Sequence, residues 1–344
     1  MAIGKVLFLY NAVIDTGQRG YVPQLMSYAQ IEGFNAALTK TGHQIIHLNL
    51  RSPEQLKDLI RSQESISIAF CIAEGFLDLP MSIAEGSGAA RVRRVLADAG
   101  LQVSHSSATA METCWHKDRT HQALRLYGIP TPDYCVIQPE SDSLEQQLRL
   151  TVDKLSFPLF VKPAAGGTSV GISDRSLVSS PDELAVQVQA LRWEFKNLPI
   201  LVEKYLPGRE YTVGVIGNSD KLVLPIIAFP PGQKIRTLKV KRKRTQYSQE
   251  KIGTGDSRYG ILSKLAANVF DAVGAQDVLR IDFREDAAGN PMVIDVNGNP
   301  ALVPTASLAQ MAQWASLSYD QFIELLLNVS LARVYGGIDG KEIA

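Results

Sequence analysis

This chain of 344 residues has little cysteine, no net charge and no long hydrophobic run. Its three cysteines show no Cys-x-x-Cys spacing, which argues against a disulfide framework or a zinc site and fits a reducing compartment. Because 35 basic and 35 acidic residues cancel, no global field attracts the chain to nucleic acid or to a membrane. No stretch approaches the length of a membrane span, and the N-terminus lacks a secretory pattern. We therefore expect a cytoplasmic protein without nucleic-acid or membrane partners.

Internal repeats and low-complexity segments are also absent, which excludes solenoids and disordered tails. The 45% hydrophobic content is enough for buried cores, and the length fits two or three domains. Over residues 1–108, short apolar runs such as KVLFLY (5–10) and SISIAFCI (65–72) alternate with helical patterns. This rhythm predicts an α/β domain of Rossmann-like type, with a parallel sheet and crossover helices.

Two further domains follow in the predicted organisation. A single helix is expected over 108–127, and residues 134–202 then read as a small α+β unit in which the strands FPLFVK and VGIS flank a glycine-rich hairpin. Residues 203–344 contain the strand-like runs EYTVGVIG and KLVLPIIAF, a helix over 258–274, and the strands DVLRIDFRE and NPMVIDVN. These runs predict a second mixed sheet.

The segment VKPAAGGTSVGIS (161–173) places a lysine, Lys162, at the end of an apolar run and a flexible hairpin directly after it. Glycines let backbone N–H groups approach an anion closely, and a lysine adds charge. The hydroxyls are better read as phosphate donors than as nucleophiles, because no histidine and acid pair is suggested. The segment therefore predicts a phosphate site with the hairpin residues Gly166, Gly167, Thr168 and Ser169.

Four polar side chains on two successive strands near the C-terminus are expected to share one face of a hairpin: Arg280, Asp282, Asp295 and Asn297. The intervening Ile281, Ile294 and Val296 are expected to point the other way. Carboxylate and amide oxygens suit a magnesium ion that bridges nucleotide phosphates, and the arginine can add fixed charge. An ordinary solvent-facing sheet surface is the alternative.

A third segment, ILVEKYLPGREYTV (200–213), has one carboxylate, Glu203, before an apolar and aromatic linker and a second, Glu210, after a Pro-Gly turn. This pattern suits an adenine on the linker and ribose hydroxyls on Glu210. Both carboxylates could equally be exposed turn charges.

In this order the three segments resemble the ATP-grasp superfamily and, within it, the D-alanine–D-alanine ligase group. The resemblance extends to AEG (73–75) and HKDRTHQALRLYGIPTPDY (116–134), so it covers nearly the whole chain. It implies that 109–202 and 203–344 are the two ATP-grasp subdomains. It also implies an ADP-forming ligase in which ATP phosphorylates an acceptor oxygen and an amine displaces the phosphate. ATP, Mg²⁺ or Mn²⁺, a small-molecule acceptor, an amino acid and a homodimer are the expected partners.

Site residues follow from the resemblance by position. The phosphate lysines correspond to Lys117 and Lys162, and the covering loop corresponds to Gly166, Gly167, Thr168 and Ser169. The adenine linker corresponds to Glu203, Lys204 and Leu206, and the ribose contact corresponds to Glu210. The magnesium ligands correspond to Asp282, Asp295 and Asn297. The transition-state arginine corresponds to Arg280, so Arg280 and Lys162 are the expected catalytic residues.

The sequence departs from the family pattern at three places. Asp295 stands where glutamate is usual, Ala301 where a glycine usually follows the proline, and the stretch from Tyr10 lacks the glycine-serine-glutamate signature that recognises the D-alanine ammonium. The last two belong to the amino-acid pockets. We therefore expect the related ligase of mycosporine-like amino-acid synthesis, which joins mycosporine-glycine to serine, threonine or glycine. The alternatives are D-alanine–D-alanine ligation and, favoured only by Asp295, an inactive nucleotide-binding regulator.

The basic stretch KIRTLKVKRKRTQYSQEK has seven cations between Lys234 and Arg244. A single patch on a neutral protein gives little counterion-release energy, so the nucleic-acid reading ranks below a solvated loop or the loop that this family folds across its active site. We expect the active-site loop, with Lys239 and Lys241 as the cations that meet phosphate. The five histidines show no metal-ligand spacing and receive no role.

Overall fold

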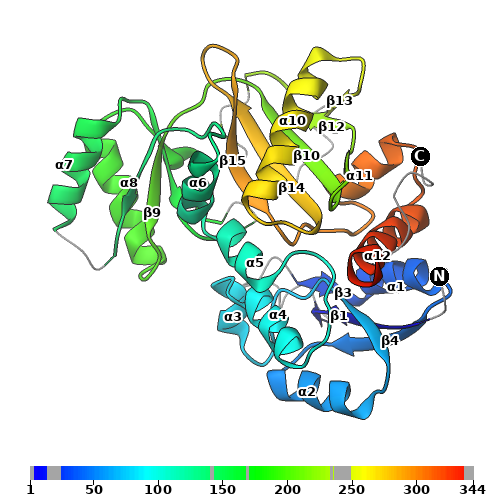
Figure 1. Ribbon diagram of the computed structural model, residues 1–344. Coiled ribbons are helices and arrows are strands. Elements are labelled where there is room, and N and C mark those ends of the chain that lie inside the picture. Colours follow the sequence, from blue (N-terminus) through cyan, green and yellow to red (C-terminus); the bar gives the residue numbers. More distant parts are fainter. Residues whose placement is uncertain are drawn as a thin grey trace.

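A computed structural model describes residues 4–13, 25–139, 143–167, 170–232, 235 and 249–336 of the chain. It contains a three-stranded parallel sheet, a four-stranded sheet and a six-stranded sheet, each with helices packed against it (Figure 1). In the described residues, no helix combines the length and the apolar character that a membrane crossing needs. A minor two-stranded pair, β2 (Ala12–Val13) with β3 (Met26–Ser27), lies beside the first sheet.

The N-terminal sheet has the parallel order β4-β1-β5, made of β1 (Lys5–Tyr10), β4 (Gln44–Asn49) and β5 (Ile66–Cys71). Its alternating residues divide between two cores: Val6 and Phe8 pack with α1 (Tyr28–Thr39), while Leu7 and Leu9 pack on the side of α2 (Pro53–Ser62) and α4 (Gly88–Asp98). A short helix, α3 (Pro80–Ala84), precedes α4. The prediction of a Rossmann-like domain is confirmed.

The single helix expected over 108–127 is wrong, because the chain forms α5 (Ala108–Trp115) and α6 (Lys117–Leu126) with a break at His116. His116 is extended, with φ −95° and ψ 103°, and it bridges Ala165 in the antiparallel sense. The next amide, that of Lys117, donates to the carbonyl of Ala164 at 2.7 Å. This tertiary hydrogen bond replaces one bond of the helix ladder, and α6 begins at Lys117.

The central sheet has the order β6-β9-β7-β8, made of β6 (Tyr134–Ile137), β7 (Leu159–Pro163), β8 (Leu177–Val178) and β9 (Ile200–Lys204). The helices α7 (Leu144–Lys154) and α8 (Pro181–Glu194) supply the other half of its core. The strand expected at 170–173 is wrong: Gly171 has φ +73°, and Ser173 caps the 3₁₀ turn Asp174–Ser176, so the pairing partner of β7 comes later, at β8. The boundary predicted after residue 202 falls inside β9.

The largest sheet is antiparallel, with the order β13-β12-β10-β14-β15 and β11 beside β10. Its strands are β10 (Glu210–Gly217), β11 (Lys221–Val223), β12 (Ile226–Ala228), β13 (Glu250–Ile252), β14 (Asp277–Glu285) and β15 (Pro291–Asn297). The run KLVLPIIAF forms two strands, because Pro225 cannot donate a ladder hydrogen bond. Leu279, Ile281 and Phe283 face α10 (Ser257–Ala272), which leaves the alternate residues of β14 on the opposite face.

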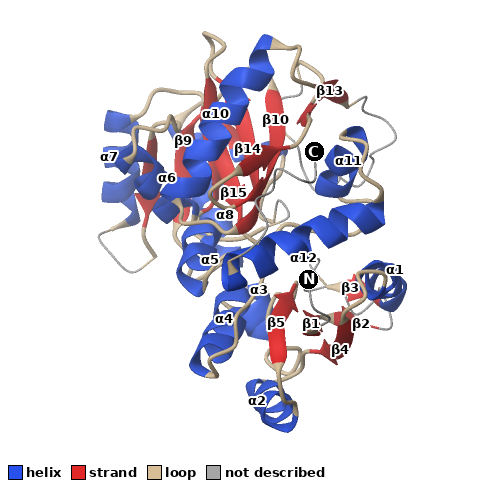
Figure 2. Ribbon diagram, turned by 45° about the vertical axis from the view of Figure 1, so that its right-hand side comes forward, coloured by secondary structure: helices blue, strands red, loops and turns tan. Residues whose placement is uncertain are grey.

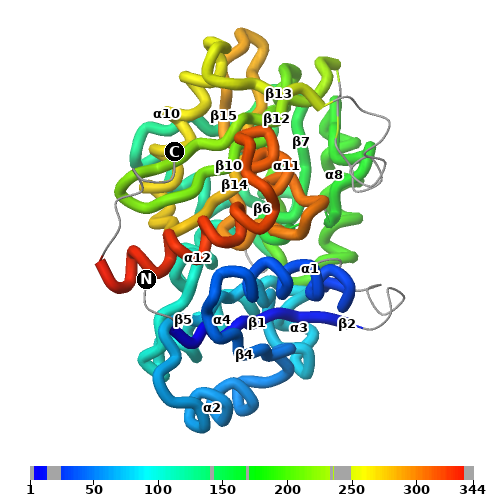
Figure 3. The backbone as a smooth tube through the Cα atoms, turned by 90° about the vertical axis from the view of Figure 1, so that its right-hand side faces the viewer, coloured from blue at the N-terminus to red at the C-terminus, as the bar shows by residue number. Residues whose placement is uncertain are grey.

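The last two helices, α11 (Ser307–Trp314) and α12 (Tyr319–Tyr335), return to the N-terminal part of the chain. Figures 2 and 3 show α12 lying between the large sheet and the N-terminal sheet, next to α1. One apolar cluster therefore contains Phe8 and Phe34 from the N-terminal domain together with Phe322 and Leu326 from α12.

Candidate active site

A cavity of about 570 Å³ opens where the three sheets approach one another. Every site residue predicted from the sequence that the structure describes lines it: Lys117, Lys162, Gly166, Gly167, Glu203, Lys204, Leu206, Glu210, Arg280, Asp282, Asp295 and Asn297. Thr168, Ser169, Lys239 and Lys241 lie outside the described residues. Segments separated by up to 180 positions in the chain therefore meet at one site.

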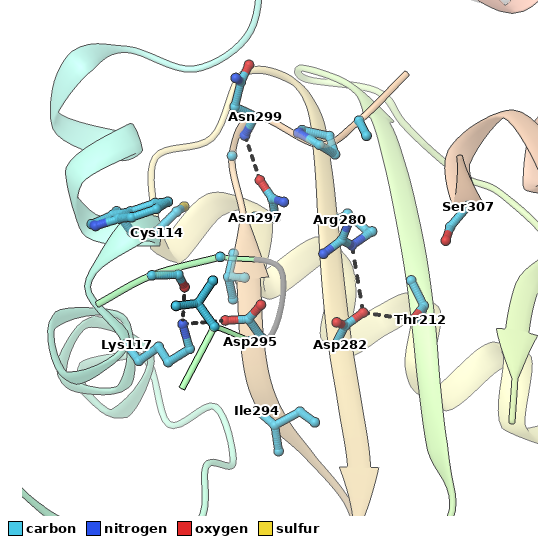
Figure 4. A pocket seen from close by; sticks show the side chains of 18 of the residues that line it. Cys114, Lys117, Thr212, Arg280, Asp282, Ile294, Asp295, Asn297, Asn299 and Ser307 are labelled. Carbon is cyan, nitrogen blue, oxygen red and sulfur yellow. Dashed lines mark hydrogen bonds and ion pairs between the residues drawn. The ribbon is translucent and has the colours of Figure 1, made fainter. Parts of the chain in front are cut away.

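The neighbouring strands β14 and β15 present the four predicted polar side chains on one face (Figure 4). Arg280 lies opposite Asn297 in the register, and Asp282 lies opposite Asp295. Thr212 Oγ1 donates to Asp282 Oδ1 at 2.7 Å, and Arg280 Nε lies 3.8 Å from the same oxygen. Three hard oxygen donors on adjacent strands fit the ligand preference of Mg²⁺.

A β-bulge changes the orientation expected for one residue of β15. The register skips Ile294, because Asp282 pairs with Asp295 while Phe283 pairs with Val293. Ile294 therefore lines the cavity, as Figure 4 shows, and the expectation that it points the other way is wrong. Bulges re-aim side chains in this manner next to active sites. The bulge also presents the Ile294 carbonyl oxygen to Lys162 Nζ, 3.1 Å away.

Lys162 belongs to a buried group of three ionisable side chains at the junction of β7, β9 and α6. Its Nζ lies 2.7 Å from Glu203 Oε2, and His121 Nε2 lies 2.6 Å from Glu203 Oε1. Burial raises the pKa of Glu203, but Lys162 and His121 outweigh it and hold that pKa well below its usual range. Glu203 thus carries a fixed negative charge that orients Lys162.

Lys117 begins α6, directly after the break at His116. Its Nζ donates to the carbonyl oxygen of Gly166 and lies 3.3 Å from Asp295 Oδ1, as drawn in Figure 4. The side chain therefore connects the glycine-rich loop with the end of β15. Gly166 has φ +126°, a backbone conformation that residues other than glycine rarely adopt.

The opposite end of the cavity is formed by the linker between β9 and β10. Leu206 is buried, and Lys204 is exposed while its backbone N–H donates to the Asp133 carbonyl at 2.8 Å. Arg284 Nη1 lies 3.6 Å from Glu210 Oε2, and its guanidinium stacks 5.3 Å from the centre of the Tyr205 ring. Glu210 is therefore a buried carboxylate that contacts Arg284 in the cavity, and it is not an exposed charge on a turn.

Sequence reasoning missed three residues that touch the predicted ones: His121, Thr212 and Arg284. Two of them carry a readable signal. His121 follows Lys117 by four positions, which places both on one face of a helix, and Arg284 continues the alternation of Arg280 and Asp282. The contact of Thr212 depends on the pairing of β10 with β14, which the sequence does not specify.

Comparison with known proteins places this geometry in a family. The model for the D-ala D-ala ligase C-terminus matches residues 124–328. The D-alanine–D-alanine ligase of Gloeobacter violaceus is 32% identical over 67% of this chain and 74% of its own length, and that of Haemophilus influenzae is 32% identical over 69% and 77%.

Solved structures share the fold. The D-alanine–D-alanine ligase of Bacillus anthracis complexed with ATP has a TM-score of 0.72 at 21% identity, covering 99% of this chain and 100% of that one. The VanG D-Ala:D-Ser ligase of Enterococcus faecalis has a TM-score of 0.71 at 17% identity, covering 95% and 99%. The ATP-grasp fold predicted from the sequence is therefore confirmed. The chain belongs to the D-alanine–D-alanine ligase family and is an ATP-grasp ligase of the ADP-forming class that makes carbon–nitrogen bonds with ATP and Mg²⁺.

Proposed function

We propose that the protein joins two amino acids of the D-alanine type, activating the carboxylate of the first with ATP. The observation that carries the proposal is the convergence of two lysines, an arginine, two aspartates and an asparagine on one cavity whose other end has a linker suited to a nucleotide. The relatives named above are ligases of D-alanine, which supports this alternative rather than mycosporine-glycine as the acceptor.

At the nucleotide end, we assign adenine to the linker with Lys204 and Leu206, and ribose to Glu210. Lys117 and Lys162 contact phosphate oxygens, with Lys162 held in place by Glu203. Asp282, Asp295 and Asn297 would hold Mg²⁺, which would supply positive charge to neutralise the phosphates. Asp295 is one methylene shorter than the glutamate usual in the family, so its carboxylate reaches less far from β15.

The transfer of the γ-phosphoryl group then depends on the positions of the reactants and on charge neutralisation, and the protein need not form a covalent bond. A substrate carboxylate oxygen bonds to the γ-phosphorus as the bond to ADP breaks, and Arg280 stabilises the negative charge of the transferring group. The amine of the second amino acid attacks the acyl carbon, phosphate leaves, and the nitrogen loses a proton. Asp282 keeps Arg280 beside the metal ligands through their 3.8 Å contact.

The finer reading of the sequence, in which mycosporine-glycine accepts serine, threonine or glycine, depends on departures in the amino-acid pockets. Ala301 lines the cavity, and the other departure falls partly outside the described residues. An inactive regulator fits less well, because Arg280, Lys162 and Asn297 all keep their places at the cavity. The homodimer remains a prediction.

A substrate matrix tests the proposal. ADP release is measured with ATP and Mg²⁺ and with D-alanine alone, D-alanine with D-serine, and mycosporine-glycine with serine, threonine or glycine, and each product is identified by mass. We expect a dipeptide from D-alanine. Turnover only with mycosporine-glycine would replace the proposed substrate class, and no ADP release with any pair would support the inactive regulator.

A further inference from the structure

Among the described residues, one carboxylate of the cavity, that of Glu74, contacts no cation within 4 Å. In the described part of the chain, the other lining carboxylates each contact a cation within 4 Å: Glu203 with Lys162, Glu210 with Arg284, Asp282 with Arg280, and Asp295 with Lys117. Glu74 also lines the cavity, and no ion pair to it occurs among the described residues. Arg93 acts on this carboxylate only at longer range and through Asn299. A carboxylate that is partly removed from water and has no cation in direct contact favours a cationic ligand.

The backbone of Glu74 is held firmly at the end of β5. The side chain of Asn11, which is buried, accepts from the N–H of Glu74 at 2.8 Å and from that of Gly75 at 3.2 Å. Gly88 of α4 packs so closely that a Cβ there would lie 2.3 Å from the Glu74 carbonyl oxygen. These contacts fix the direction in which the side chain enters the cavity, which is what a binding residue requires.

One oxygen of the Glu74 carboxylate is oriented by Asn299. Asn299 Nδ2 donates to Glu74 Oε1 at 2.9 Å, and Asn299 Oδ1 accepts from the buried Arg93 at 3.3 Å, which fixes the amide in one orientation. The backbone N–H of Asn299 donates to Asn297 Oδ1 at 2.9 Å (Figure 4). Glu74 is thereby positioned beside the proposed metal site, at the end of β15 where amino-acid chemistry must occur.

From this geometry we infer that Glu74 binds the α-ammonium group of an amino-acid substrate, with Asn299 as its positioning residue. The inference rests on the proposed function and deepens it by assigning a residue to the amine. Oε2 has no hydrogen-bond partner among the described residues and is available to the ammonium. Burial raises the pKa of Glu74 to about 7, against the opposing effects of Asn299 and Arg93, and a bound ammonium would favour the ionised carboxylate.

Calorimetric titration of the whole protein, loaded with Mg²⁺ and a non-hydrolysable ATP analogue, tests the inference. The probes are D-alanine, glycine and L-serine, with D-lactate as the analogue that carries a hydroxyl in place of the ammonium. Glu74→Gln keeps an oxygen for Asn299 and removes only the charge. We expect it to weaken binding of the amino acids by about tenfold or more, because a charge-assisted contact is lost, and to change binding of D-lactate and of the nucleotide by less than about threefold.

Glu85→Gln is the matched control, since Glu85 is exposed and lies eleven positions further along the chain. It should bind every probe as the wild type does. Equal affinity of Glu74→Gln and wild type for the amino acids would overturn the inference, as would equal losses for D-alanine and D-lactate, or no binding of any amino acid to the wild type. A protein that binds amino acids through Glu74 but releases no ADP would instead overturn the proposed function.

Discussion

At the scale of single residues, a substitution at Asp282 should impair metal binding and turnover without destabilising the fold. Asp282→Asn keeps an oxygen to accept from Thr212 Oγ1 but loses the charge that a magnesium ligand supplies. We expect turnover to fall at least about 100-fold and the Mg²⁺ requirement to rise, with a change in unfolding free energy of less than about 1 kcal/mol. Initial rates of ADP release across Mg²⁺ concentrations, together with urea unfolding, measure both effects. Asp153→Asn, on the exposed face of α7, is the control, and a Mg²⁺ response unchanged by Asp282→Asn would contradict the ligand assignment.

Site residues could be predicted from the sequence where polar side chains of suitable chemistry recur at every second position of a strand. Arg280 and Asp282 share a face because they stand two apart in one strand, and the same holds for Asp295 and Asn297. Glu74 was not assigned a role from the sequence, because its carboxylate is positioned by a hydrogen bond from Asn299, which is 225 positions away. The buried ion pair of Lys162 with Glu203 was likewise not predicted, because it depends on the pairing of β7 with β9.

At the scale of elements, Gly171 fixes the path of the chain after β7. It has φ +73°, and a Cβ there would lie 2.5 Å from Pro163 Cγ, directly after Lys162. Gly171→Ala should lower the unfolding free energy by about 2–4 kcal/mol, from backbone strain and overpacking together, and should raise the KM for ATP. Urea unfolding and ATP-dependent rates provide the measurement.

Gly100→Ala is the matched control for that prediction. Gly100 has φ +71°, but a Cβ there would meet nothing within 4 Å. The control should show the backbone strain alone, about 1–2 kcal/mol, and an unchanged KM for ATP. If both variants behaved alike, the contact with Pro163 would have no part in positioning Lys162.

Most elements were predictable from periodicity and caps, whereas three local features were not. The break at His116, the bulge at Ile294 and the late strand β8 each depend on a partner elsewhere in the chain. Local pattern favours a continuous helix over 108–127, and only the pairing of His116 with Ala165 outweighs that preference. Two of these features, the break at His116 and the bulge at Ile294, contact the segments that bring Lys117 and Lys162 to the cavity. Departures from local sequence preference are expected at functional sites.

At the scale of the whole molecule, the C-terminal helix joins parts that the sequence suggests are separate. Asp277, at the start of β14, accepts hydrogen bonds from Arg333 and Ser330 of α12 and from the backbone N–H of His105. Phe8, Phe34 and Phe322 belong to one apolar cluster that also contains Val278, the residue after Asp277. Boundaries predicted from composition alone could not include such long-range packing. We infer that the N-terminal sheet and α12 lose stability together.

His105 makes the packing between α12 and the N-terminal domain sensitive to pH. Burial lowers its pKa to about 3, and the nearby Arg93 and Arg333 act in the same direction while Asp277 opposes them. Below the ordinary pKa of 6.5 the unfolded chain binds a proton that the folded chain does not, so stability is present above pH 6.5 and is lost as the pH falls towards 3. The loss of stability approaches about 1.4 kcal/mol for each pH unit.

His105→Asn tolerates the left-handed φ of +65° and removes this titration. Urea unfolding at pH 7, 5.5 and 4.5 should therefore show a shallower acid dependence for the variant, although the smaller side chain lowers its stability at pH 7. Parallel pH profiles for the two proteins would place the acid sensitivity elsewhere in the fold.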